Sequence, residues 1–150
     1  MTTPNDLFMT ALCVWREARN QGDEGMRAVA NVIRNRAIRN STNPYYEITK
    51  KLQFSSITAP GDAQLALWPV GFDTRWTEAQ QIAADVLGGS AIDNTGGAVD
   101  YYNPDAIRST KTFQLGGALI NFPDGWNAAV LHQTVTIGSR PNMHVFFKET

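Results

Sequence analysis

The chain has 150 residues, of which 43% are hydrophobic and 18% are charged, and its formal net charge is -1. A chain of this length can bury a substantial core, and its hydrophobic content excludes a largely disordered protein. The near-zero net charge excludes the strongly basic surface of many nucleic-acid-binding proteins, so no nucleic-acid partner is expected. We therefore expect one globular domain that spans residues 1–150 and works as a monomer.

The segment that begins at Pro4 predicts a first helix that is buried on most of its sides. Its apolar residues occupy nearly the whole circumference of a helix instead of a single stripe. They are Leu7, Phe8, Ala11, Leu12, Val14, Trp15 and Ala18. Gly22 is expected to end this helix, and Asp23 to cap a second, amphipathic helix that runs to about Asn40 and packs against the first.

The middle of the chain is expected to hold one further helix between two irregular segments. Prolines and glycines interrupt any regular period over residues 42–76, which predicts a long loop region with short turns. The next helix is indicated by Thr77 and Gln80, which match a capping box, and by the two glycines at 88–89, which act as a stop signal. After DNTGGAVDYYNP at 93–104 the sequence is again irregular as far as Ala129, where NAAV indicates a helical turn.

The last part of the chain has the alternation of short strands. HQTVTIG at 132–138 and HVFFKE at 144–149 predict two strands, joined by a turn at 139–143. No internal repeat or linker divides the chain. The expected fold class is therefore α+β, dominated by helices, with a small β-hairpin.

Few residues suit a metal or cofactor site. The two histidines, His132 and His144, form no HExxH pattern, and paired CxxC motifs are absent, so neither a metal nor a cofactor is expected. Cys13 is the single cysteine, which excludes an intramolecular disulfide. It lies within an apolar helix, whereas a cysteine peptidase needs an exposed and activated thiolate.

The N-terminal sequence has no basic region before its short apolar run. Further along, no segment approaches 18 consecutive apolar residues. We therefore expect neither a standard secretory signal nor insertion into a membrane.

Glu17 is a carboxylate near the end of an otherwise apolar helix. On a helix it lies over Cys13 and Val14, and a carboxyl group held partly out of water resists ionisation. Such an acid can donate a proton to a leaving oxygen, as cleavage of a glycosidic bond requires. The alternative is a surface ion pair with a nearby arginine, and spacing alone does not separate the two. The arginines in reach are Arg16, Arg19 and Arg27.

The residues EAR at 17–19, followed by EGMRAVANVIRNR at 24–36, resemble the SleB-like cell-wall hydrolase family. These are lysozyme-like enzymes that cleave peptidoglycan in spore germination and in some bacteriophages. Later segments match the family pattern in the same order: QFSS at 53–56, DNTGGAVDYYNP at 93–104, and TIG with HVFF, ending at Phe147. The resemblance covers most of the chain and implies a lysozyme-like domain in which Glu17 is the catalytic glutamate.

Several residues are candidates for binding the glycan. Tyrosine rings and an asparagine amide suit sugar faces and N-acetyl groups, and the family pattern implies that the QFSS segment lines the groove. The candidates are Phe54, Ser55, Tyr101, Tyr102, Asn103 and His144. Each also has a structural alternative: a buried Phe54 beside turn-forming serines, a strand end at 101–103 with one of the two tyrosines in the core, and a histidine that serves the fold.

The expected activity is cleavage of peptidoglycan glycan strands between N-acetylmuramic acid and N-acetylglucosamine. No second carboxylate is marked by spacing, which favours a lytic transglycosylase; a hydrolytic lysozyme and a non-catalytic glycan-binding or virion-associated module are the alternatives. We expect a bacteriophage endolysin, made in the host cytoplasm and acting on the cell wall in the periplasm after release. Residues 113–126 and 139–143 depart from the family pattern as insertions.

Overall fold

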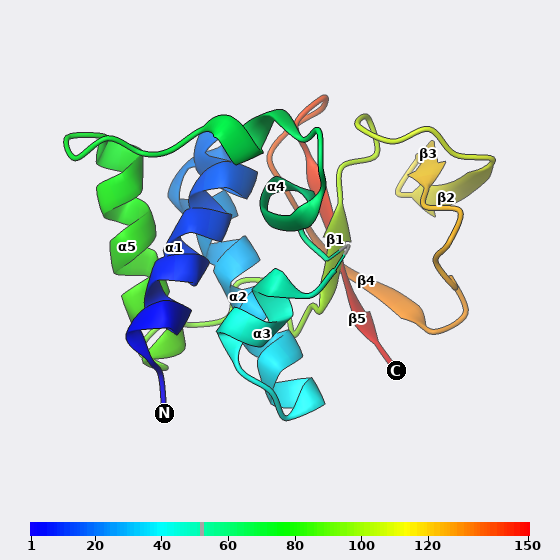
Figure 1. Ribbon diagram of the computed structural model, residues 1–150. Helices are drawn as coiled ribbons and strands as arrows, with labels where there is room; N and C mark the ends of the chain where they lie inside the picture. Colours follow the sequence, from blue (N-terminus) through cyan, green and yellow to red (C-terminus); the bar gives the residue numbers. More distant parts are fainter. Residues whose placement is uncertain (52) are drawn as a thin grey trace. The chain divides into compact units, whose positions relative to one another are not determined.

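The computed structural model describes residues 1–51 and 53–150, which form two compact units, Met1–Thr95 and Gly96–Thr150 (Figure 1). The first unit is helical and the second is built from strands. This combination confirms the predicted α+β fold dominated by helices. Within the described residues, no helix combines the length and apolar character that crossing a membrane requires.

The first unit packs three long helices together, with shorter helices between the second and third. They are α1 (Pro4–Ala18), α2 (Gly22–Asn40), α3 (Pro44–Thr49), α4 (Ser55–Thr58) and α5 (Thr74–Leu87), with 3-10 turns at Arg19–Gln21 and Ala63–Ala66. The predicted loop region over residues 42–76 is therefore wrong in part, because two short helices and a 3-10 turn form inside it. Asn43 caps the first of these by accepting from the Tyr46 backbone N–H at 2.9 Å.

Helix α1 has the buried character that its sequence predicts. Its start is fixed by a capping box, in which Thr3 and Asp6 bond to each other's backbone N–H. Residues 10–16 are all buried. The predicted cap of α2 was wrong: no side chain caps its start, and Asp23 instead accepts from Arg27 Nε at 2.8 Å, one turn further on.

Helix α5 begins earlier than the sequence pattern indicates. Asp73 is its cap, since Asp73 Oδ1 accepts from the backbone N–H of Arg75 at 2.9 Å and of Trp76 at 3.3 Å. The capping box predicted at Thr77 therefore lies inside the helix. The end of the helix at Leu87, before the two glycines, confirms the predicted stop.

The second unit contains two antiparallel sheets. One has the strand order β1-β5-β4 and the other pairs β2 with β3. The strands are β1 (Asp100–Tyr102), β2 (Lys111–Leu115), β3 (Ala118–Phe122), β4 (Leu131–Ile137) and β5 (His144–Glu149). The predicted hairpin is confirmed as β4 and β5. The irregular segment predicted between residue 104 and Ala129 was wrong, because it contains β2 and β3, and NAAV forms a turn without a helix.

Aromatic rings form the core of the second unit. Its buried members are Tyr102, Ile120, Phe122, Val145 and Phe147, and partly buried side chains that include Phe113 and Trp126 pack against them. Residues 113–126 therefore supply much of this core from β2, β3 and the turn that follows them. The apparent insertion is a structural part of the unit.

Candidate active site

Glu17 is half-buried on the last turn of α1. One turn before it, Cys13 is completely buried. Burial, and after it the nearby carboxylate of Glu17, hold the pKa of the Cys13 thiol well above its usual range. Cys13 therefore stays protonated and is unsuited to act as a nucleophile, and its thiol belongs to the immediate electrostatic surroundings of Glu17.

Arg16, the neighbour of Glu17 in the chain, is a buried arginine that holds the segment between α4 and α5. It is 7% exposed. Its Nη1 donates to the Ser56 carbonyl at 3.0 Å, and its Nε and Nη2 donate to the Leu67 carbonyl at 3.2 and 3.1 Å. Its Cζ lies 4.7 Å from the ring centroid of Trp68. The guanidinium thus fixes a surface segment against the turn that carries Glu17.

Two further side chains of α1 and its following turn strengthen this attachment. Trp15 Nε1 donates to Asp73 Oδ2 at 3.1 Å, and Arg19 Nη1 donates to Gln64 Oε1 at 2.7 Å. Arg19 also lies over the Trp15 ring, with its Cζ 4.2 Å from the centroid. Residues on either side of Glu17 therefore bind the same segment, in its middle and at its end.

Phe54 and Ser55 differ in their exposure at the start of α4. Phe54 is 1% exposed, and the Arg36 Cζ lies 5.1 Å from its ring centroid. This burial favours the structural alternative for Phe54. Ser55 is exposed and remains a candidate for contact with substrate.

The two tyrosines of β1 also have different surroundings. Tyr102 is 7% exposed, and burial raises the pKa of its hydroxyl to about 12. Its ring packs against Phe122, Trp126 and Phe147, so the core alternative applies to Tyr102. Tyr101 is half-buried and is the candidate of the pair for stacking on a sugar.

His144 lies beside Tyr101 in the second unit. Their ring centroids are 4.9 Å apart, and Tyr101 also stacks on Phe146 at 5.3 Å. Burial lowers the pKa of His144 to about 4, so the imidazole is neutral near neutral pH. Its Nδ1 is buried without a hydrogen-bond partner among the described residues. His144 can therefore act as a neutral hydrogen-bonding group but not as a cation.

Asn103 connects two loops of the second unit. Its Nδ2 donates to the Pro141 carbonyl at 2.9 Å, and its Oδ1 accepts from the Asp105 N–H at 2.9 Å. Arg140 Nε donates to Asp105 Oδ2 at 2.8 Å. The predicted substrate-binding amide thus has structural partners, and the segment at 139–143 is held against the end of β1.

The start of the DNTGGAVDYYNP segment docks on α2, a role that the sequence reasoning missed. Asn31 is 1% exposed, and its Nδ2 donates to Asn94 Oδ1 at 3.3 Å. One turn later, Asn35 Nδ2 donates to Asp93 Oδ2 at 3.0 Å. Thr95 is completely buried and donates through its hydroxyl to Asp93 Oδ1 at 2.6 Å. The one-turn spacing of the two asparagines was the available signal.

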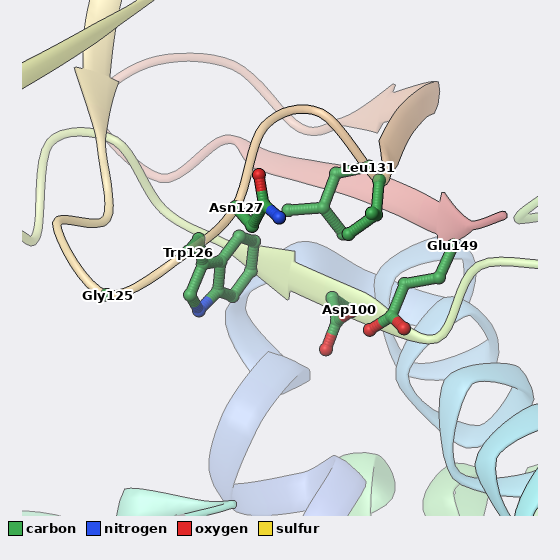
Figure 2. Close-up of a pocket in the computed structure, with 7 residues that line it drawn as sticks. Asp100, Gly125, Trp126, Asn127, Leu131 and Glu149 are labelled. Carbon is green, nitrogen blue, oxygen red and sulfur yellow. The ribbon is translucent and has the colours of Figure 1, made fainter.

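The predicted site residues fall into two groups. Glu17 and Ser55 lie in the first unit, while Tyr101, Asn103 and His144 lie together in the second. The second unit also has a pocket of about 230 Å³ that none of the predicted site residues lines. Its lining includes the Trp126 indole and the Asp100 and Glu149 carboxylates (Figure 2). Across residues 1–51 and 53–150, no group of three or more His, Cys, Asp or Glu side chains is placed to hold a metal ion.

Comparison with known proteins supports the resemblance seen in the sequence. A family model described as cell wall hydrolase matches residues 20–146, a range that begins three residues after Glu17. The chain is also similar to the catalytic domain of the germination-specific lytic transglycosylase SleB from Bacillus anthracis. The TM-score is 0.66 and the identity 28%, over 98% of this chain and 97% of that chain. No curated protein has a significantly similar sequence. The chain therefore belongs to the cell wall hydrolase family and is a peptidoglycan-cleaving enzyme.

Proposed function

We propose that this enzyme is a lytic transglycosylase that uses Glu17 as its acid and base. It cleaves the glycan strand between N-acetylmuramic acid and N-acetylglucosamine. The observation that carries the proposal is the position of Glu17, a half-buried carboxyl group on the last turn of a core helix, beside a completely buried thiol. The similarity to a lytic transglycosylase catalytic domain supports the same reaction.

In the proposed mechanism one carboxyl group serves both steps. Protonated Glu17 donates its proton to the glycosidic oxygen as the bond from that oxygen to C1 of the muramyl residue breaks. The resulting carboxylate then takes the proton of the muramyl C6 hydroxyl, whose oxygen attacks C1. The products are a free N-acetylglucosamine hydroxyl and a 1,6-anhydromuramyl end, and Glu17 regains its proton.

The proposed substrate contacts come from polar and aromatic side chains with exposed surface. Tyr101 offers part of a ring that Phe146 supports from one side. Ser55 is an exposed hydroxyl at the start of α4. The neutral imidazole of His144 and the amide of Asn103 would hydrogen-bond to the sugar or its N-acetyl group. Phe54 would support Ser55 from the interior of the first unit, and Tyr102 would support Tyr101 from the core of the second.

Hydrolysis is the second candidate reaction, and Asp62 is the carboxylate that we propose for it. Asp62 interacts electrostatically with Arg16, the chain neighbour of Glu17. A lysozyme mechanism needs a second carboxylate, roughly 5–5.5 Å from the acid as a nucleophile or about 6.5–9.5 Å from it as a base for water. The two reactions give products that differ in mass by one water.

The test of the proposed activity is the clearing of a suspension of purified peptidoglycan by the wild type and by Glu17→Gln. The amide has the shape of the carboxyl group but cannot donate and recover a proton, so Glu17→Gln should lose activity and keep its melting temperature. Glu24→Gln is the matched control, because Glu24 is an exposed carboxylate in the first turn of α2. More than a few per cent of wild-type activity in pure Glu17→Gln would reject the role of Glu17. A wild type that binds the wall without clearing it would favour a non-catalytic glycan-binding module.

We further propose that the biological role is host lysis, as a bacteriophage endolysin that works as a monomer. The enzyme would be made in the host cytoplasm and reach the cell wall when the membrane is opened. Cells that express it should stay intact until a membrane-permeabilising agent is added and should then lyse within minutes. Lysis without the agent would indicate another route to the wall, and Glu17→Gln should prevent lysis in both cases.

A further inference from the structure

Residues 67–72 present large apolar side chains to solvent beside the end of α1. The exposed fractions are 41% for Leu67, 61% for Trp68, 53% for Val70 and 88% for Phe72. A group of exposed apolar side chains is a place to look for a binding residue, and one member of such a group often supplies most of the binding energy. Trp68 is the member of this group whose ring rests on a buried guanidinium.

Trp68 is held in position although its ring is open to solvent. Arg16 lies 4.7 Å from the ring centroid, and two of its nitrogens bond to the carbonyl of Leu67, the residue just before Trp68. A third nitrogen bonds to the Ser56 carbonyl. The planar guanidinium therefore fixes both the backbone that leads into Trp68 and the ring itself.

We propose that Trp68 is a stacking platform for a sugar ring of the glycan strand and that Arg16 positions it. This assignment rests on the proposed function. An indole presents a broad apolar face with a polar edge, which suits the face of a sugar that carries C–H groups. A ring that is already immobilised loses little conformational entropy when it binds, so the contact contributes more fully to affinity.

The platform is linked to the proposed acid because Arg16, which contacts the Trp68 ring, is the chain neighbour of Glu17 on α1. Arg16 and Glu17 are consecutive residues of α1, so their Cα atoms are about 3.8 Å apart. From the Glu17 Cα to the Trp68 ring, the path consists of one peptide unit, one arginine side chain and one stacking contact. A glycan of a few sugar units can span this separation. Trp68 would therefore hold the strand at a position away from the bond that is cleaved.

The composition of the segment favours a glycan over a lipid surface. Residues 52–74 include no lysine or arginine, and the charged residues among them are Asp62 and Asp73. Segments that bind anionic membranes carry several basic residues, each of which adds to the attraction. The arginine under Trp68 is buried and engaged with carbonyls, so it offers no charge to a lipid headgroup.

The experiment measures binding to purified insoluble peptidoglycan by sedimentation, in the Glu17→Gln background so that the substrate is not consumed. Trp68→Ala should weaken binding about tenfold, and Trp68→Phe should restore most of it. Phe72→Ala is the matched control, because it removes an exposed aromatic ring from the same segment. It should bind as tightly as its parent. In the active enzyme, Trp68→Ala should raise KM for soluble glycan oligomers and leave kcat close to the wild-type value.

Three outcomes would overturn the assignment. Binding by Trp68→Ala within twofold of the parent would show that the ring contributes no contact. Equal loss in Trp68→Ala and Phe72→Ala would indicate general adhesion of an apolar segment. If the protein binds vesicles of phosphatidylcholine and phosphatidylglycerol, and both Trp68→Ala and Phe72→Ala abolish this binding, the segment binds a lipid surface. If the wild type does not clear peptidoglycan but its binding still depends on Trp68, the proposed cleavage is rejected and the role of Trp68 in binding is retained.

Discussion

The indole Nε1 of Trp15 donates a hydrogen bond to Asp73 Oδ2 at 3.1 Å, while Asp73 Oδ1 caps α5 through the Arg75 backbone N–H at 2.9 Å. A single carboxylate thus joins the helix that carries Glu17 to the start of α5. Trp15 is 5% exposed, so its N–H depends on this acceptor for its hydrogen bond.

Asp73→Ala should therefore destabilise the protein more than loss of a helix cap alone. The substitution removes the cap and leaves the buried indole N–H without its acceptor, for a total of about 1–3 kcal/mol in the free energy of unfolding. Asp73→Ser should fall between the wild type and Asp73→Ala, because serine can cap the helix but does not reach the indole. Urea unfolding of the three proteins measures the difference. Equal stability of Asp73→Ser and Asp73→Ala would show that the cap contributes nothing.

The same carboxylate explains why the start of α5 could not be predicted correctly. Asp73 and Thr77 are four residues apart, and each matches a local pattern for a helix start. The helix is capped by Asp73, the one of the two that also accepts a hydrogen bond from Trp15, 58 residues away in the sequence. A local sequence pattern does not show a contact with a residue so distant in the chain.

Part of what was missed was visible in the sequence. In residues 111–122 apolar side chains alternate on both sides of two glycines, as in a hairpin, and Leu115 pairs with Ala118 across the turn. Interpreting this segment as an insertion concealed that signal. The pairing of β1 is different, because its three residues pair with β5 more than 40 positions later in the chain. The buried character of α1, the end of α5 and the terminal hairpin were predictable because local periodicity and glycine positions determine them.

The candidate site was predictable to a similar degree. Local sequence and the family resemblance pointed to Glu17, whose half-buried position is consistent with the apolar helix around it. The attachment of residues 56–68 by Arg16 could not be predicted, because its acceptors are backbone carbonyls that any residue provides. The burial of Tyr102, and not of Tyr101, follows from which face of β1 meets the core, and three residues are too few for the pattern to show this.

Tyr102→Phe should leave stability unchanged or raise it by up to about 1 kcal/mol. The Tyr102 hydroxyl is buried and has no hydrogen-bond partner among the described residues, so its removal relieves a desolvation cost. Tyr102→Ala should cost about 3–5 kcal/mol, because it leaves a cavity within the aromatic core. Thermal unfolding followed by circular dichroism compares the variants. A clear loss of stability in Tyr102→Phe would mean that the hydroxyl is hydrogen-bonded in solution.

Tyr101→Ala should lower activity more than stability, whereas Tyr102→Ala should mainly lower stability. Its half-buried ring is the one we assign to substrate, so turnover of peptidoglycan should fall about tenfold or more. Tyr101→Phe should keep most of the activity, since the stacking face remains. If Tyr101→Ala lowers the melting temperature as much as Tyr102→Ala does, both tyrosines serve the core and the substrate assignment fails.

His144 should make stability depend on pH between about 6.5 and about 4. Its pKa is lowered by burial to about 4 in the folded state, while an unfolded chain has the ordinary value near 6.5. As the pH falls through this window, the unfolded chain binds a proton that the folded protein does not bind, so stability decreases. Above the window both states are neutral, and below it both are protonated, so this contribution is constant there.

Urea unfolding at several pH values tests this dependence. His144→Gln should lose less stability than the wild type between pH 6.5 and 4, and His132→Gln, which changes an exposed histidine on β4, should behave like the wild type. Parallel pH curves for the wild type and His144→Gln would show that burial does not lower the pKa of His144.

The last prediction concerns the product that Glu17 generates. After the glycosidic bond breaks, C1 of the muramyl residue can be attacked by its own C6 hydroxyl or by water. The C6 hydroxyl is already bound and loses no further translational freedom, so a site with one catalytic carboxyl group favours the intramolecular attack. Mass spectrometry of digested peptidoglycan should then show 1,6-anhydromuramyl ends, lighter by one water than reducing ends. Reducing-end muramic acid as the sole product would reject the transglycosylase reaction while keeping Glu17 as the acid. In that event Asp62→Asn is the next substitution to test, because Asp62 is the carboxylate that acts electrostatically on the arginine beside Glu17.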